Sequence, residues 1–243
     1  MRILVISDIH ANLVALEAVL AEAKDYEAVW CLGDLVGYGP NPNECVERVR
    51  GLKNLTCLVG NHDKAVLGEL DVNTFNQDAK TAILWTRDTL TPDNFKYLQS
   101  LQPLAYQDEF TLVHASPRQP IWEYILNLQI ARDNFPHFHT RYCLVGHTHV
   151  PVVYYEVDTN GECVEAAADY EHPVTFNSHR LIINPGSVGQ PRDSNPDAAY
   201  AFLDFYTLVW EYRRIPYDIA ATQNRMRAAH LPDRLVLRIA YGW

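Results

Sequence analysis

The fold is decided by the stretch Ile3-Leu4-Val5-Ile6-Ser7-Asp8-Ile9-His10, close to the start of the chain. Its apolar residues predict a buried strand, and Asp8 and His10 follow directly after that strand ends. Residues 12–24 come next and carry apolar side chains at helical spacing, which predicts an amphipathic helix. A strand that feeds a helix in this way is the first unit of an α/β fold.

An apolar run that ends in a polar cluster occurs four more times along the chain. These runs cover 28–32, 55–59, 110–113 and 142–145, and they end at Asp34, at Asn61-His62, at His114 and at His147-Thr148-His149. Helical segments between the first three runs predict parallel strands with right-handed crossovers.

The last third of the chain has a different pattern. Alternating strand candidates near 152–157, 162–167, 180–184, 199–204 and 207–214 predict an antiparallel or mixed second sheet. The stretch Asp158-Thr159-Asn160-Gly161 predicts a turn between the first two of these candidates. A helix over 217–229 and a shorter one close the chain.

The polar clusters can converge, because ligands of open α/β sheets bind outside the carboxyl ends of the strands. Asp8 and His10 are two residues apart, as are His147 and His149, and on an extended backbone each pair would point to one side. A lone histidine after a strand is ordinarily a packed or surface residue, but five such clusters at successive strand ends point to metal binding. The candidate ligands are Asp8, His10, Asp34, Asn61, His114, His147 and His149.

These donors are oxygen and nitrogen atoms without a thiolate, which suits Mn²⁺, Fe or Zn²⁺ better than a soft, cysteine-rich site. Seven protein ligands exceed what one octahedral ion uses while it leaves room for substrate. Two ions about 3.5–4 Å apart that share one carboxylate would use them all. Asp34 is alone at its strand end and is therefore the predicted bridge.

In type, order and interval, the five motifs resemble the signature of the calcineurin-like metallophosphoesterase superfamily, over about residues 1–190. More narrowly, Gly33-Asp34-Leu35-Val36-Gly37-Tyr38-Gly39-Pro40 and Asn184-Pro185-Gly186-Ser187-Val188-Gly189-Gln190-Pro191-Arg192 resemble its small bacterial and archaeal phosphodiesterase branch. The resemblance implies an α/β fold, a four-layer α/β/β/α sandwich of two mixed β-sheets with a dinuclear site at the sheet rim.

The resemblance also implies a role for each site residue. Asp8, His10, Asp34 and His149 would hold one metal, and Asp34, Asn61, His114 and His147 would hold the other. His62 would stay off the metals and face the substrate. The expected cofactors are two divalent ions, Mn²⁺ first, with Fe, Zn²⁺ and Ni²⁺ as alternatives.

These expectations predict an enzyme, a dinuclear metal-dependent phosphoric ester hydrolase. Two divalent cations lower the pKa of a bridging water, so that hydroxide is available near neutral pH for an in-line displacement. His62 would protonate the leaving oxygen or stabilise the transition state. The favoured substrate is a small or nucleotide-derived phosphodiester. The alternatives are a phosphomonoesterase, including a protein phosphatase, and a non-catalytic scaffold with this fold.

One departure from other branches favours the diester. Protein Ser/Thr phosphatases and symmetrical dinucleoside-tetraphosphate hydrolases resemble each other in carrying an arginine shortly after Gly-Asp, where this chain has Gly37-Tyr38-Gly39. A bidentate arginine suits a dianionic monoester, and the two glycines are compatible with room beside the metals. Arg118 and Arg192 are the candidates for replacing that arginine in substrate binding, and surface ion pairs are the alternative.

We expect a single domain over 1–243, with a helical insertion at about 64–108 and an aromatic-rich insertion at about 116–140. In the second insertion Trp122, Tyr124, Phe135 and Phe138 predict packing or a subunit contact rather than a wall for a nucleobase.

The composition bounds the partners. The chain has 243 residues, 20 Lys plus Arg against 30 Asp plus Glu, and a net charge of −10, which argues against general binding of nucleic acids or anionic membranes. No apolar run approaches the ~20 residues of a membrane span. Five cysteines without CxxC spacing predict reduced thiols in the cytoplasm. The sequence leaves open a homo-oligomer, the native metal, the substrate and the group that orients His62.

Overall fold

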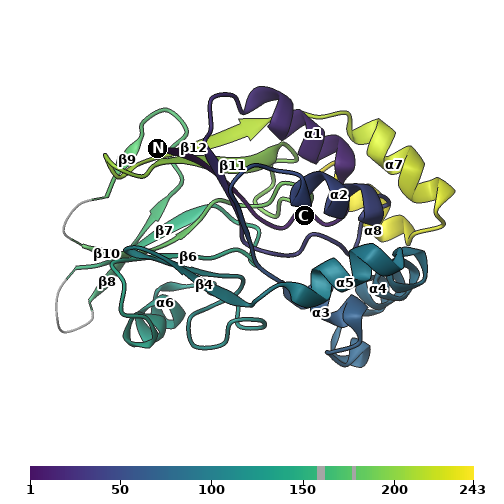
Figure 1. Ribbon diagram of the computed structural model, residues 1–243, viewed down its shortest axis with the longest axis horizontal. Coiled ribbons are helices and arrows are strands. Elements are labelled where there is room, and N and C mark those ends of the chain that lie inside the picture. The colour runs from purple at the N-terminus through teal and green to yellow at the C-terminus, as the bar shows by residue number, and fades with distance from the viewer. Residues whose placement is uncertain (158–161, 177–178) are drawn as a thin grey trace.

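The computed structural model describes residues 1–157, 162–176 and 179–243. It contains two six-stranded mixed sheets with helices around them (Figure 1). This confirms the predicted mixed α/β class with two mixed sheets. The turn predicted at 158–161 lies outside the described residues.

The first sheet has the strand order β3-β2-β1-β11-β12-β9. Its strands are β1 (Arg2–Ile6), β2 (Ala28–Cys31), β3 (Leu55–Cys57), β9 (Val174–Thr175), β11 (Ala198–Asp204) and β12 (Val209–Ile215). β1, β2 and β3 are parallel, as predicted. β11 runs antiparallel to β1, with Arg2 opposite Asp204 and Val5 opposite Ala201.

The second sheet has the order β4-β5-β6-β10-β7-β8. Its strands are β4 (Leu104–Gln107), β5 (Phe110–Val113), β6 (Tyr142–Leu144), β7 (Val152–Glu156), β8 (Cys163–Ala167) and β10 (Arg180–Asn184). β5, β6 and β10 are parallel neighbours, so two of the five strands that end in polar clusters belong to this sheet.

The prediction of a second sheet from the last third of the chain is confirmed for β7, β8 and β10 and wrong for β11 and β12, which lie in the first sheet. β11 and β12 extend the first sheet, because β11 is buried along nearly its whole length and completes the open edge of β1. Pairing between strands so distant in sequence carries no local sequence signal. β4 and β9 were not predicted, and β4 lies within the range assigned to the helical insertion.

Most helices gather on one side of the molecule, at the right of Figure 1, and α6 (Leu128–Asn134) lies apart from them below the second sheet. The other helices are α1 (Leu13–Glu22), α2 (Pro42–Arg50), α3 (Asn61–Leu67), α4 (Gln77–Thr89), α5 (Pro92–Ser100), α7 (Ile219–Ala228) and α8 (Asp233–Arg238), with 3₁₀ turns η1 (Val72–Thr74) and η2 (Phe135–His137). Asn12, Asn76 and Asp218 cap α1, α4 and α7, since each side chain accepts a backbone N–H of the first turn.

Successive side chains of each strand point to opposite faces of the sheet, so each sheet packs against a different core on either side. In β1, Ile3 and Val5 pack into a core that also holds Phe110 and Leu112 of the other sheet. Leu4 and Ile6 point the opposite way, into a core shared with the helices. On the second sheet, the outer residues of β5 and β6 pack with the segment around α6. The cores thus follow the α/β/β/α order that the resemblance implied.

Within the described ranges, no helix combines the length and the apolar character needed to cross a bilayer.

Candidate active site

The predicted metal ligands come together where strands of both sheets end. They form two groups that share Asp34, and within each group the possible ligand atoms lie within 4.8 Å of one another. The first group is Asp8, His10, Asp34 and His149, and the second is Asp34, His114 and His147. The Asn61 Oδ1 atom, at the start of α3, lies 3.2 Å from His114 Nε2 and so joins the second group.

The sequence argument assumed that the backbone of the Asp8/His10 and His147/His149 pairs is extended, and the structure shows that it is not. Positive φ angles occur at Asp8 (53°), His10 (49°), Asp34 (53°), His147 (65°) and His149 (62°). Left-handed backbone at a residue other than glycine costs about 1–2 kcal/mol. Such strain persists where surrounding contacts enforce it, and it concentrates at functional sites.

Backbone carbonyl groups orient the four histidines of the cluster. His10, His114 and His149 have Nδ1 at 3.2, 2.9 and 2.6 Å from the carbonyl oxygens of Val36, Leu32 and Gln190. His147 differs, because its Nε2 atom lies 3.3 Å from the carbonyl of Trp122. An N–H donated to a carbonyl leaves the other ring nitrogen unprotonated, which is the usual arrangement of a metal-binding imidazole.

The free nitrogens and carboxylates face one another. His10 Nε2 lies 3.1 Å from His149 Nε2, so two nitrogens with lone pairs meet without a donor between them. Asp34 Oδ2 lies 3.5 Å from Nε2 of both His10 and His114. This buried oxygen has no hydrogen-bond partner among the described residues, while Asp34 Oδ1 accepts the His62 N–H at 2.9 Å. This donor set fits divalent cations, with Asp34 Oδ2 placed between the two groups.

The buried carboxylates of the cluster repel one another, and bound cations would reduce this repulsion. Burial, together with the neighbouring carboxylates of Asp63 and Asp8, raises the pKa of Asp34 well above its usual range. Burial, followed by the charge of Arg192, lowers the pKa of His149 to about 4. The neutral imidazole and the carboxylate are the forms that coordinate metals, and bound cations would offset the repulsion between the acidic groups.

His62 lies beside the cluster but is not anchored like the ligands. Its ring contacts those of Tyr38, His10 and Phe75, with centroids 4.3, 4.9 and 5.1 Å away. Its Nδ1 atom is buried without a hydrogen-bond partner in the described part of the chain. Burial and Arg192 lower its pKa well below 6.5, so the neutral imidazole dominates near neutral pH.

Asp63 does not hold the ring of His62. Its two carboxylate oxygens accept the N–H groups of Val36 at 3.0 Å and Gly60 at 2.9 Å. Asp63 thus braces the loops that carry Asp34 and Asn61. Aromatic packing orients His62 instead.

The glycines around Tyr38 do not leave space for substrate. A Cβ atom at Gly37 would lie 2.6 Å from His62 Nδ1, and one at Gly39 would lie 2.2 Å from the carbonyl oxygen of His10. Tyr38 itself is buried against α7 and α8. The His62 ring and backbone atoms fill the space that was predicted next to Gly37 and Gly39. The two glycines therefore give no support for a diester substrate.

The structure separates the two candidate arginines. Arg118 pairs with Glu123 and Asp133, and its backbone N–H binds the Asn134 side chain. These contacts fit the ion-pair interpretation, and a role of Arg118 toward substrate stays a prediction. Arg192 is half-buried, its charge acts on His62 and His149, and its Nη2 donates to the Gln190 side chain at 3.0 Å.

The four aromatic residues of the second insertion lie in two different environments. Phe135 and Phe138 are buried and pack with α6, as predicted. Tyr124 instead stacks on His147, with ring centroids 3.7 Å apart, and Trp122 meets Phe75 edge-on at 4.9 Å. The carbonyl groups that orient the histidines were missed in the sequence analysis, because every residue type has a backbone carbonyl. Phe75, whose ring contacts His62 and Trp122, was also missed.

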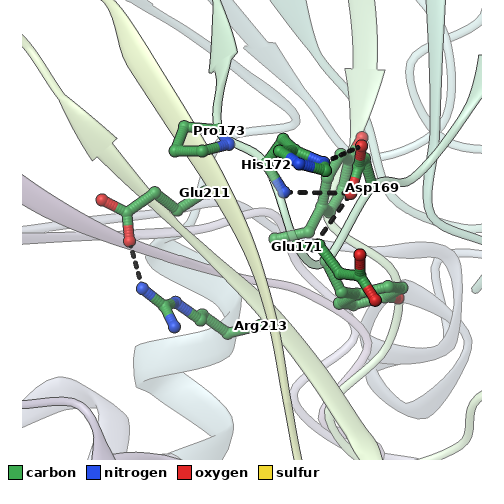
Figure 2. A pocket seen from close by; sticks show the side chains of 8 residues that line it. Asp169, Glu171, His172, Pro173, Glu211 and Arg213 are labelled. Carbon is green, nitrogen blue, oxygen red and sulfur yellow. Dashed lines mark hydrogen bonds and ion pairs between the residues drawn. The ribbon is translucent and has the colours of Figure 1, made fainter.

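A separate hollow is lined by Asp169, Tyr170, Glu171, His172, Pro173 and the β12 residues Glu211–Arg213 (Figure 2). Asp169 accepts bonds from the backbone of Glu171 and His172 and lies 3.0 Å from the His172 ring. Glu211 pairs with Arg213. None of the predicted site residues lines this hollow.

Gly60→Ala tests how tightly the Asp34 carboxylate is held. A Cβ atom at Gly60 would lie 2.0 Å from Asp34 Oδ1 and 2.5 Å from its backbone N, so the carboxylate must shift. A misplacement of about 1 Å can cost ~100-fold in rate. We expect a loss of that order in phosphoesterase activity, with reduced metal content. Gly51→Ala is the control, since its nearest atom would be 3.5 Å away; equal behaviour of the two variants would refute the packing argument.

Comparison with known proteins agrees with this geometry. Residues 1–207 match the calcineurin-like phosphoesterase superfamily domain. A metallophosphoesterase structure from Sphaerobacter thermophilus is 47% identical, covers 100% of both chains and has a TM-score of 0.92. An uncharacterised protein of Methanocaldococcus jannaschii is 39% identical over 99% of this chain and 98% of its own.

A partial similarity extends to a protein with a named activity. A symmetrical bis(5'-nucleosyl)-tetraphosphatase of Glaesserella parasuis is 31% identical over 53% of this chain and 49% of its own. The family match covers most of the sequence and includes every candidate metal ligand. The chain therefore belongs to the calcineurin-like phosphoesterase superfamily, and this membership implies a metal-dependent phosphoester hydrolase.

Proposed function

We propose that the protein is a phosphodiesterase that hydrolyses small or nucleotide-derived phosphodiesters with two divalent ions, Mn²⁺ first, Fe, Zn²⁺ and Ni²⁺ being the alternatives. The observation that carries this proposal is the arrangement around Asp34. Its Oδ2 atom, which has no hydrogen-bond partner in the described part of the chain, lies 3.5 Å from one histidine of each ligand group. One oxygen shared in this way suits a carboxylate that bridges two cations.

Each ligand group would hold one ion, and Asp34 would belong to both. When bound, a pair of divalent ions supplies a nucleophile near neutral pH and offsets charge on the phosphate. The chain's own contribution is rigidity: four carbonyl-anchored imidazoles keep their donor atoms fixed, so little reorganisation accompanies catalysis.

His62 acts on the leaving group. It is not tied to a backbone carbonyl as the ligands are, and it lies between the first ligand group and the aromatic side chains at the mouth of the site. As a neutral imidazole it carries one N–H, which can donate to the leaving oxygen as charge develops there. All seven ligands and His62 are brought together, which disfavours a non-catalytic scaffold.

The missing arginine after Asp34 supports a diester over a monoester. A phosphodiester carries one negative charge, and a terminal monoester carries up to two, which a bidentate arginine would answer. The similarity to a symmetrical bis(5'-nucleosyl)-tetraphosphatase, which covers 53% of this chain, supports a nucleotide-derived substrate. A phosphomonoesterase is the second candidate, because Arg192 lies next to the cluster: its backbone N–H donates to the carbonyl oxygen of His149 at 3.3 Å.

Substrate preference tests the proposal. With Mn²⁺ bound, we expect a higher kcat/KM for bis-p-nitrophenyl phosphate than for p-nitrophenyl phosphate. Both substrates release the same leaving group, so the comparison isolates the effect of diester against monoester. A clear preference for the monoester would replace the proposal with the phosphomonoesterase.

Arg192→Ala is expected to reduce kcat/KM for the monoester more than for the diester, because only the monoester presents a second negative charge to the guanidinium. Arg118→Ala tests the other candidate arginine in the same way, and Arg48→Ala, which removes an exposed arginine paired with Glu17, is the control that should have no selective effect. Equal losses on both substrates for Arg192→Ala would remove Arg192 from phosphate binding.

The same proposal includes a small phosphorylated substrate as partner and a cytoplasmic location. The net charge of −10 supports neither general nucleic-acid binding nor attachment to anionic membranes.

A further inference from the structure

Aromatic side chains that the proposed mechanism does not use lie beside the cluster of candidate metal ligands. The seven candidate ligands are at most 2% exposed. Trp122 and Tyr124 are each 38% exposed, and Phe75 is half-buried. These three residues are called the aromatic rim, and they supply accessible surface beside a site whose ligands are buried.

The aromatic rim links both sides of the site. Phe75, just after η1, contacts the ring of His62 at 5.1 Å. Trp122, from the insertion after β5, meets Phe75 edge-on at 4.9 Å. Tyr124 stacks on His147 at 3.7 Å with an interplanar angle of 26°. The rim therefore makes two sets of ring contacts beside the cluster: Phe75 and Trp122 on the side of His62, and Tyr124 on His147 of the second ligand group.

A cation completes this surface. Arg192 Nη2 donates to the Gln190 side chain at 3.0 Å and to the Tyr38 hydroxyl at 3.5 Å, and its charge acts on Tyr124, while its Nε atom is buried without a partner among the described residues. Flat rings beside a guanidinium, and beside the two cations that the ligand groups would hold, would be complementary to a phosphate ester that carries a flat aromatic group.

We propose that the aromatic rim is a subsite for a nucleobase, so that nucleotide esters are the preferred substrates. This inference rests on the proposed function, because the rim matters only if a phosphate binds at the adjacent cluster. Stacking on aromatic rings tolerates any base, since every base presents a π-face. The competing view is that the rings only shield His147 and pack the insertion in place.

Binding of two matched probes to the Mn²⁺-loaded protein tests the subsite. Adenosine 5'-monophosphate and ribose 5-phosphate share the sugar and phosphate and differ in the base. One stacked base is expected to make the nucleotide bind about 5- to 150-fold tighter by isothermal titration calorimetry. Trp122→Leu and Tyr124→Leu should each reduce that ratio toward one. Trp122→Leu keeps the backbone carbonyl that holds His147, so its metal content should stay unchanged.

Tyr106→Leu is the matched control, because Tyr106 is 65% exposed on β4 and is not part of the rim. It should keep the wild-type ratio. A wild-type ratio near one, or a ratio that both rim variants retain, overturns the subsite while diester hydrolysis stands. If neither probe binds and no diester is hydrolysed, the proposed function itself fails. Phe75→Leu, outside the Trp122 loop, provides an independent variant if the loop variants do not fold.

Discussion

Asp34→Ala is expected to lose both metal ions, and with them phosphoesterase activity. Asp34 is the residue common to both ligand groups, and its Oδ2 atom lies between His10 and His114 at 3.5 Å from each. Loss of an outer-shell partner of a metal ligand typically costs ~10–100-fold in metal affinity, so loss of a shared ligand should cost more. Elemental analysis after Mn²⁺ reconstitution and dialysis measures the result.

Asp88→Ala provides the control for this substitution. Asp88 is an exposed aspartate on α4, and its removal should leave close to two ions per chain. Circular dichroism should show that Asp34→Ala keeps its secondary structure, because both sheets are held by cores that do not include Asp34. If Asp34→Ala retains both ions, the bridging assignment is wrong.

His62→Ala should keep its metals and lose turnover. Its ring lies beside the cluster without the carbonyl anchor of the four ligand histidines, and its Nδ1 atom faces Gly37. Removal of a group that transfers or shares a proton with the leaving oxygen typically costs ~10²–10⁴-fold in rate. The loss should shrink for diesters with acidic leaving groups, which need little help to depart.

The measurements for His62 are kcat over a series of aryl diesters and metal content for the same preparation. His172→Ala is the control, because the His172 side chain is 77% exposed and outside the site. An unchanged rate, a loss of metal, or a rate loss independent of the leaving group would each exclude the proposed role.

The clustering of the candidate ligands could be predicted from sequence because it depends on strand ends. Asp8, Asp34 and His114 each follow an apolar strand, and the carboxyl ends of parallel strands gather at one edge. The geometric reason given for the Asp8 and His10 pair was nevertheless wrong. Positive φ angles at both residues, and not an extended backbone, aim them at one centre. Such angles depend on tertiary contacts that local sequence does not encode.

The sheet assignment failed where pairing is distant in sequence. β11 pairs with β1 across about the whole chain, and nothing in residues 198–204 distinguishes a neighbour of β1 from a neighbour of β10. The parallel strands β1, β2 and β3 were predicted correctly, because short helical crossovers constrain which strands can be adjacent.

The surroundings of the metals were the least predictable part. The carbonyls of Val36, Leu32, Gln190 and Trp122 orient the histidines through the backbone, so any side chain at those positions could do the same. The four aromatics of the second insertion look alike in sequence, yet Phe135 is buried in a core and Tyr124 stacks on His147. Only the path of the loop separates these roles.

The most direct test of a two-ion centre built on Asp34 is a crystal structure of the Mn²⁺-reconstituted protein with anomalous diffraction data. The account predicts two manganese peaks about 3.5–4 Å apart, one within reach of His10 and His149 and the other of His114 and His147, with Asp34 bound to both. A single peak, or two peaks that do not share Asp34, would contradict it.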